Sequence, residues 1–101
     1  MMQGSTPTHE FVLPFDASTV QEARVTYRQN GEIVLEKTEA DCTFEGNSVK
    51  VVLTEEETFN YSPEYNVQIQ LRVLTADGVV MTSQPEQVRC GEAFNKEVLN
   101  E

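Results

Sequence analysis

The sequence contains no tryptophan, one histidine, two cysteines and only 7 lysines and arginines among 101 residues. The lone histidine, His9, has no identifiable partner for a catalytic triad, and we interpret it as a surface residue in a polar N-terminal lead. No P-loop, GxGxxG or GxSxG motif occurs anywhere in the chain. We therefore predict a protein that is not an enzyme, and we expect neither a cofactor nor a bound metal.

The two cysteines are too few for a disulfide framework and lack the spacing of a zinc site. Cys42 alternates with Phe44 and Cys90 alternates with Val88, positions that suit small buried side chains. We interpret both as free thiols. A disulfide between them stays open as the alternative, and it would require that their strands be neighbours.

Positive charge is scarce, because 17 acidic residues outnumber the basic ones and give a formal net charge of −10. The acids are spread along the chain and would repel a phosphate backbone, so we expect no nucleic-acid partner. There is no long apolar run, and the start MMQGSTPTHE lacks the features of a signal peptide. We therefore expect no membrane attachment and synthesis for the cytoplasm.

The strongest pattern is the stretch from Tyr65 to Ser83. Apolar residues there fall on every second position, which predicts a strand with one buried and one wet face: Tyr65, Val67, Ile69, Leu71 and Val73. Asp77-Gly78 then supplies a tight turn, and Val79, Val80 and Met81 are expected to pair back.

Two further hairpins and two single strands follow from the same reasoning. Thr8 to Leu13 predicts an edge strand, and Glu86 to Cys90 predicts the last strand. Val20 to Lys37 predicts a hairpin closed by Asn30-Gly31, and Cys42 to Leu53 predicts another closed by Glu45-Gly46-Asn47. Their inward residues are expected to be Ala23, Val25, Tyr27, Ile33, Leu35, Val49, Val51 and Leu53. Such strands favour an antiparallel sandwich or barrel.

Helical signals are confined to two short segments. Thr54 and Glu57 form a capping-box pattern at the start of Thr54 to Tyr61, which predicts one or two helical turns crossing between sheets. In the tail 92–101, Phe94 and Val98 lie four apart beside Leu99, the spacing of a short helix face. That face is expected either to pack on its own domain, residues 9–91, or to hook a neighbouring subunit.

Acidic and aromatic residues offer two candidate sites that we weigh against simpler interpretations. A calcium site could be imagined at two acidic groups, Glu55-Glu56-Glu57 and Glu39 with Asp41. Both groups lack the regular oxygen spacing and the glycine at the bend of calcium loops. We therefore interpret the first group as the start of a helix with solvated charges and the second as a solvated loop. Three tyrosines could line a carbohydrate shelf, but core or core-edge placement is the preferred interpretation: Tyr27, Tyr61 and Tyr65.

The order of motifs resembles a known family. Leu53-Thr54, the acidic turn, Tyr65 and Ala76-Asp77-Gly78, followed by Val80 and Ser83, resemble the second half of immunoglobulin-like modules of phage tails, such as the N-terminal domain of the phage baseplate upper protein. The first half is similar to short stand-alone proteins of Firmicutes phages and prophages, through three motifs: Thr6-Pro7-Thr8, Leu13-Pro14-Phe15-Asp16 and Tyr27-Arg28-Gln29-Asn30-Gly31.

The resemblance implies an immunoglobulin-like β-sandwich of about seven strands, although the chain lacks the tryptophan and cysteine pair of antibody domains. It also implies a structural or adaptor protein of a phage or prophage tail or baseplate, present in the host cytoplasm during assembly and then in the virion. Its partners would be other virion proteins, and carbohydrate or cell-surface binding is the alternative. We predict partner contacts at the residues off the inward alternation and in the tail: Val12, Val34, Val52, Leu74, Phe94, Val98 and Leu99.

Overall fold

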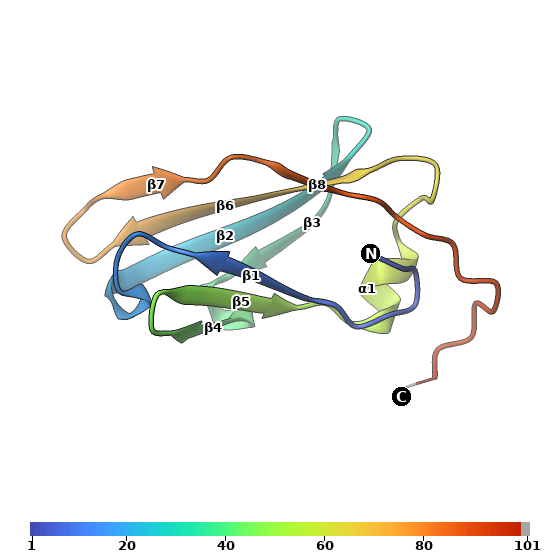
Figure 1. The fold of residues 1–101 in the computed structure, drawn as a ribbon, viewed down its shortest axis with the longest axis horizontal. Helices are drawn as coiled ribbons and strands as arrows, with labels where there is room; N and C mark the ends of the chain where they lie inside the picture. The colour runs from blue at the N-terminus through green and yellow to red at the C-terminus, as the bar shows by residue number, and fades with distance from the viewer. Residues whose placement is uncertain (100–101) are drawn as a thin grey trace.

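The computed structural model describes residues 1–99 and places them in two antiparallel sheets that pack face to face (Figure 1). The small sheet has the order β1-β5-β4, and the large sheet has the order β3-β2-β6, with β7 and β8 both pairing with the far side of β6. The strands are β1 (Thr8–Val12), β2 (Val20–Gln29), β3 (Glu32–Thr38), β4 (Cys42–Glu45), β5 (Ser48–Val52), β6 (Val67–Thr75), β7 (Val80–Thr82) and β8 (Glu86–Val88). The short helices are η1 (Ala17–Thr19), η2 (Glu39–Asp41) and α1 (Glu55–Phe59).

This topology is that of an immunoglobulin-like β-sandwich. The chain passes from one sheet to the other between β1 and β2, between β3 and β4, and between β5 and β6, as strands B to F of that fold do. β7 and β8 lie end to end along β6 and are the two halves of one interrupted strand, with Pro85 in the gap. The sandwich therefore has seven strands, as predicted, when β7 and β8 are counted as one. Among residues 1–99, no further strand pairs with the outer edge of β1.

Period-two alternation builds the core between the sheets. Val67, Leu71 and Val73 on β6 are at most 2% exposed, and Val25 and Tyr27 on β2 are fully buried. Each such side chain stabilises the fold by roughly 1.5–3 kcal/mol relative to an exposed position. Apart from Tyr65, the inward positions predicted from β2, β5 and β6 are confirmed.

Tight turns close the three predicted hairpins. Asn30 and Gly31 both adopt positive φ, at 49° and 80°, which is the backbone twist that a two-residue hairpin turn needs. Gly46 and Gly78 serve the other two hairpins with φ of 57° and 88°. All three pair in antiparallel register as predicted.

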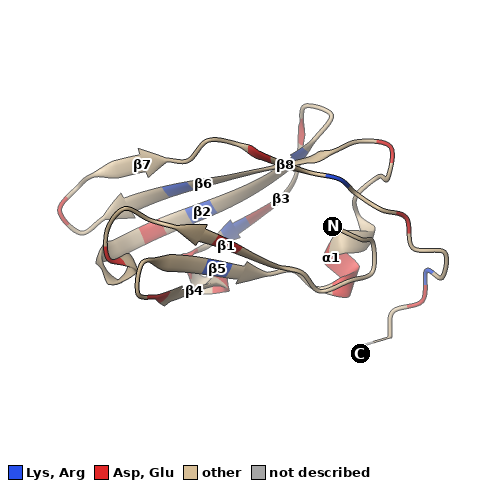
Figure 2. Cartoon of the chain, in the orientation of Figure 1, with Lys and Arg blue, Asp and Glu red and all other residues tan. Residues whose placement is uncertain are grey.

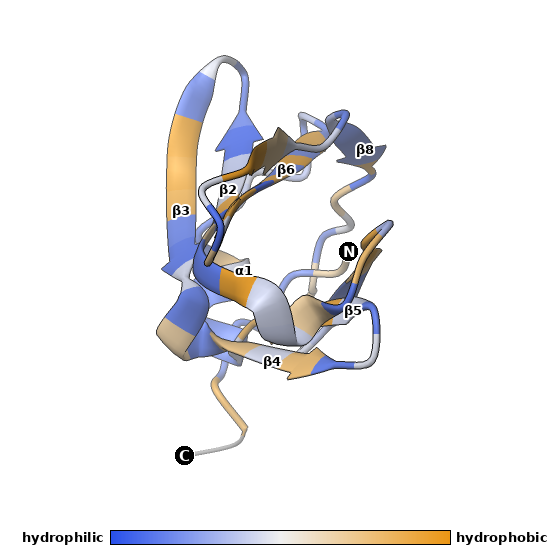
Figure 3. Cartoon of the chain, turned by 90° about the vertical axis from the view of Figure 1, so that its left-hand side faces the viewer, coloured by the Kyte–Doolittle hydropathy of each residue, from blue (hydrophilic) through white to orange (hydrophobic). Residues whose placement is uncertain are grey.

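β3 departs from the predicted alternation. The two-residue turn pairs Ile33 with Arg28, whose side chain points outward, so Ile33 is 65% exposed and its predicted burial is wrong. A register shift then leaves Val34 as an extra residue and pairs Leu35 with Tyr27. Val34, predicted to face solvent, is instead partly buried against the core, and this prediction is wrong as well. The orange stretch of β3 in Figure 3 covers this region.

The crossover helix α1 forms as predicted. The Thr54 hydroxyl accepts a hydrogen bond from the Glu57 amide at 3.2 Å, and the Glu57 carboxylate accepts one from the Thr54 amide at 2.8 Å. Glu57 also pairs with Lys37 of β3 at 2.6 Å, where both side chains are largely covered. This largely covered ion pair therefore ties α1 to β3.

The first residues of the chain lie beside the segment that follows β8. Met2 forms a parallel bridge with Gly91, and the amide of Gln3 donates to the Gly91 carbonyl at 2.9 Å. Residues 92–99 form no helix, so the predicted helix is wrong there, while residues 100 and 101 lie outside the described part. Phe94 is 94% exposed, so the helix face has no surface to pack on and a short helix is not stabilised.

Two remaining expectations concern the thiols and the membrane. Cys42 and Cys90 are free thiols, as predicted; Cys42 begins β4 in the small sheet, whereas Cys90 follows β8 of the large sheet. Burial raises the pKa of both. Within residues 1–99 no helix is long and apolar enough to span a membrane.

Candidate functional site

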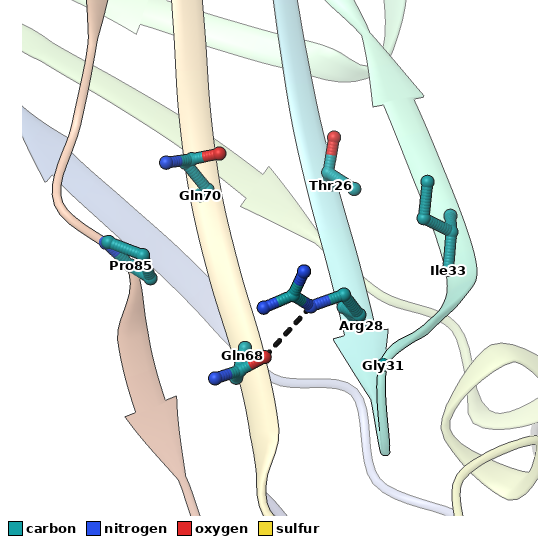
Figure 4. Close-up of a pocket in the computed structure, with 7 residues that line it drawn as sticks. All are labelled: Thr26, Arg28, Gly31, Ile33, Gln68, Gln70 and Pro85. Carbon is teal, nitrogen blue, oxygen red and sulfur yellow. Dashed lines mark hydrogen bonds between the residues drawn. The ribbon is translucent and has the colours of Figure 1, made fainter.

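The outer face of the large sheet carries a surface hollow of about 400 Å³ (Figure 4). Because Val25 and Tyr27 point into the core, their neighbours on β2 point outward, and the same rule applies along β6. The hollow is lined by Thr26, Arg28, Gly31, Ile33, Gln68, Gln70 and Pro85. We call this surface, with the adjoining residues of β2, β6 and β7, the outer face.

Two arginines of the outer face are each held in place by a hydrogen bond from the Nε atom to a neighbouring strand. Arg28 Nε donates to Gln68 Oε1 at 2.8 Å across the β2–β6 pair, and Arg72 Nε donates to Thr82 Oγ1 at 3.1 Å across the β6–β7 pair. Among residues 1–99, neither guanidinium lies within ion-pair distance of a carboxylate. Their terminal nitrogens therefore remain available for a planar anion such as a carboxylate.

Arg24 on the same face behaves differently. Its Nη1 pairs with Glu39 at 2.8 Å, so this guanidinium already has an acidic partner. Figure 2 shows acidic residues distributed over strands, loops, α1 and the tail, consistent with a net charge of −10. Against that background, Arg28 and Arg72 are two preoriented positive groups on an acidic molecule.

Exposed aliphatic side chains accompany the arginines. Ile33 at one end of the outer face is 65% exposed, and Val80 toward the other end is 57% exposed. A second hollow of about 250 Å³ lies over β2, β6 and β7 and is lined in part by Arg72, Leu74 and Val80. Arginine is among the residue types that are enriched in protein–protein interfaces.

The predicted contact residues are scattered over several surfaces. Val12 and Val52 lie on the outside of the small sheet and are 76% and 54% exposed, whereas Leu74 is partly buried beside the second hollow. In the tail, Phe94 and Leu99 are 94% and 79% exposed. The partly buried Val98 lines a third hollow beside α1.

His9 is partly buried and has a hydrogen-bonding partner, which corrects its interpretation as a surface residue. It occupies an inward position of β1, and its Nδ1 is 2.7 Å from the Tyr27 hydroxyl on the opposite sheet. Burial and the nearby N-terminal amino group lower the pKa of His9, while Glu86 opposes them. The partner that sequence reasoning could not identify comes from a strand 18 residues away.

The tyrosines divide between core and surface. Tyr27 and Tyr61 are buried as predicted, with ring centroids 6.3 Å apart, and desolvation raises the pKa of both hydroxyls. The Tyr61 hydroxyl has no hydrogen-bond partner within the described part of the chain. Tyr65 is 43% exposed and precedes β6, so of the predicted core or core-edge placement the core is excluded for this residue.

The candidate cation ligands have structural roles. Glu57 completes the cap of α1, and hydrogen bonds from Lys37 and Thr54 lower its pKa although partial burial opposes them. Glu39 pairs with Arg24, and the Asp41 carboxylate accepts from the Thr38 amide at 3.0 Å. In the described residues, no group of three His, Cys, Asp or Glu side chains is arranged to hold a metal ion.

Comparison with known proteins gives a weak structural likeness. No protein-family profile matches the chain, and no curated protein matches it. The V domain of amphioxus IgVJ-C2 shares 12% identity over 89% of this chain and 96% of that domain, with a TM-score of 0.37. The description of the fold therefore depends on strand order and crossovers.

Proposed function

We propose that the chain is a non-enzymatic structural or adaptor protein of a phage or prophage particle, in the tail or baseplate. The source of the phage assignment is the sequence resemblance described above. The proposal that the protein acts by docking is supported chiefly by the outer face, where Arg28 and Arg72 are fixed by neighbouring strands and lack acidic partners in residues 1–99.

The mechanism is passive docking of a rigid block. The sandwich holds both arginines on paired strands, so their orientation costs little additional side-chain entropy on binding. A neighbouring subunit would supply carboxylates to the guanidinium groups and aliphatic side chains to Ile33 and Val80, which are both exposed. In a symmetric particle the same contact would be repeated, so weak individual contacts would add up by avidity.

The test is the presence of the chain in purified particles. A bacterium carrying the prophage is induced, particles are purified on a density gradient, and their proteins are quantified by mass spectrometry. We expect the chain to sediment with tail or baseplate proteins in a fixed ratio. Its presence only in the soluble fraction, with particles of normal composition, would contradict the proposal.

Carbohydrate binding on the host surface is the second candidate. It is favoured by the lining of the first hollow, where two glutamine amides, a threonine hydroxyl and Arg28 gather groups that hydrogen-bond to sugars. The same lining contains no aromatic side chain on which a sugar ring could stack. A thermal shift on adding cell-wall glycans, lost in Gln68→Ala, would favour this candidate over protein docking.

A further inference from the structure

The strand pairings of the large sheet set the outward side chains of the outer face in four rows that cross β2 and β6. From the first row to the last, the paired residues are Glu22 with Leu74, Arg24 with Arg72, Thr26 with Gln70, and Arg28 with Gln68. Successive rows lie about 7 Å apart, twice the rise per residue of a strand. Figure 4 shows the last two rows side by side. Glu22 and Arg28 therefore stand at opposite ends of the face on one strand, about 20 Å apart.

Each of these two end groups lacks a partner of opposite charge. Glu22 and Arg28 are both exposed, and among residues 1–99 neither lies within ion-pair distance of an opposite charge. Nε of Arg28 is held by Gln68 at 2.8 Å, which leaves its terminal nitrogens available to bind a carboxylate. One strand of the outer face thus carries an unpaired acid at one end and an oriented, unpaired base at the other.

A second copy of the chain supplies both missing partners at once. When two outer faces meet across a twofold axis that crosses the strands at mid-face, the first row of each copy lies over the last row of the other. Glu22 then lies opposite Arg28 twice, once at each end of the contact. The middle rows exchange as well, so Arg72 of one copy lies opposite Gln70 of the other, whose side-chain oxygen can accept a hydrogen bond from the guanidinium.

The alternative twofold axis, parallel to the strands, is disfavoured. It keeps every row in place and exchanges β2 with β6, so Arg24 of one copy would lie opposite Arg72 of the other. Like charges opposite each other lower the affinity, and Glu22 would face Leu74 and stay unpaired. The positions of the charges therefore select one of the two orientations.

The relief of the outer face fits the selected orientation. Leu74 and Val80 belong to the first row, since they pair with each other across β6 and β7, and Val80 is 57% exposed. Both lie over the hollow of about 400 Å³ around the last row of the other copy, where Arg28, Gln68 and Pro85 are part of the lining. Aliphatic side chains of each copy are thereby covered by the concave part of the other.

The size of the face is that of a weak but specific dimer. Four strand positions about 4.8 Å apart and four rows about 7 Å apart give a face of roughly 500 Å² per copy. Two copies together bury roughly 1,000 Å², the lower limit for a specific interface. The net charge of −10 on each copy opposes association, but its reach is limited to about 8 Å at physiological salt.

We propose that the outer face binds a second copy of this chain, as a twofold dimer in which Glu22 of each copy pairs with Arg28 of the other. This inference rests on the proposed function, which makes the outer face a docking surface, and it names the subunit that docks there. The contact is closed by its symmetry, so association stops at the dimer. The dimer is then the unit that is built into a particle.

Sedimentation velocity of the full chain at physiological salt, from micromolar to millimolar concentration, tests the pairing. We expect the unmodified chain to pass from monomer to dimer and to form nothing larger. Glu22→Arg sets arginine against arginine and Arg28→Glu sets glutamate against glutamate, so each variant alone should dimerise about tenfold or more weakly. Glu22→Arg also lowers the net negative charge, so a general repulsion between copies would have the opposite effect. Glu97→Arg makes the same charge change in the exposed tail and should dimerise no more weakly than the unmodified chain.

Mixing the two variants gives the decisive result. Glu22→Arg and Arg28→Glu present opposite charges to each other at both ends of the contact, so an equimolar mixture should form a 1:1 dimer with the affinity of the unmodified chain. If Glu22→Arg does not fold by circular dichroism, Glu22→Lys replaces it. A chain that stays monomeric at every concentration, association unchanged by both single variants, or a mixture without dimers would overturn the proposal.

This outcome is separable from that of the particle test of the proposed function. A monomeric chain that is recovered in purified particles would overturn the second copy as the occupant and leave the docking role in place. Dimers that follow the charge exchange, with the chain absent from particles, would support the pairing and contradict the role in the particle.

Discussion

A single hydrogen bond between His9 and Tyr27 links the two sheets across the core. In its neutral form His9 can accept, at Nδ1, a hydrogen bond of 2.7 Å from the Tyr27 hydroxyl. Burial lowers the pKa of His9 below its ordinary value of 6.5, so the unfolded chain binds the proton more readily than the folded one. Neutral His9 therefore contributes its full stability above pH 6.5, and this contribution is lost as the pH falls through the pKa of His9 in the folded chain.

This linkage predicts a pH dependence specific to His9. Between pH 7 and pH 5 the free energy of unfolding of the unmodified chain should fall more steeply than that of His9→Gln, because carboxylate titration is common to both. Urea unfolding at a series of pH values measures the difference. Parallel curves, or an NMR titration midpoint of His9 at or above 6.5, would show that its environment does not disfavour the charged imidazole.

The cap of α1 gives a second prediction for a single side chain. Thr54→Ala removes the oxygen that accepts the Glu57 amide at 3.2 Å, and we expect a loss of about 1 kcal/mol in the free energy of unfolding. Thr54→Ser retains the hydroxyl and is the matched control. Equal loss in both variants would assign the effect to the methyl group and not to the cap.

Among the elements, the Asn30-Gly31 turn sets the register of the β2–β3 hairpin. Gly31 has φ of 80°, and a Cβ added there would meet no atom within 4 Å. Gly31→Ala should therefore destabilise through backbone strain alone, by about 1–2 kcal/mol. Asn30→Gly is the control, since glycine accepts the φ of 49° there freely. Thermal unfolding of both variants checks this, and an unchanged midpoint for Gly31→Ala would contradict the turn geometry.

Alternation and turn chemistry are local signals, and they were sufficient to predict most of the strands. β6 follows period two without interruption, and α1 follows its capping box. The tail pattern failed because Phe94 and Val98 have the spacing of a helix face but no common surface to pack against. The bulge at Val34 also escaped prediction, since it depends on pairing with β2 rather than on β3 alone.

The outer face could have been found partly from sequence. A two-residue turn at Asn30-Gly31 already requires Ile33 to lie opposite Arg28, outside the core. The sequence does not indicate which of the exposed arginines form ion pairs with acidic residues. Arg24 reaches Glu39, whereas Arg28 and Arg72 contact neutral side chains, and that outcome depends on the registers of three strand pairs.

At the scale of the whole molecule, we propose the outer face as the docking surface of an acidic, rigid sandwich. The double variant Arg28→Gln, Arg72→Gln removes both unpaired guanidinium groups and leaves the inward residues unchanged. Lys50→Gln, Arg89→Gln removes the same charge at positions outside the lining of the hollow, and is the matched control. Thermal unfolding of each purified variant establishes that the fold is retained.

The most direct measurement is the amount of each double variant in gradient-purified particles, quantified by mass spectrometry against the unmodified chain. We predict that the arginine variant is reduced about tenfold or more, as expected for losing two charged anchor contacts, while the control variant is incorporated normally. Equal incorporation of the two variants, with both folded, would contradict the assignment of docking to the outer face.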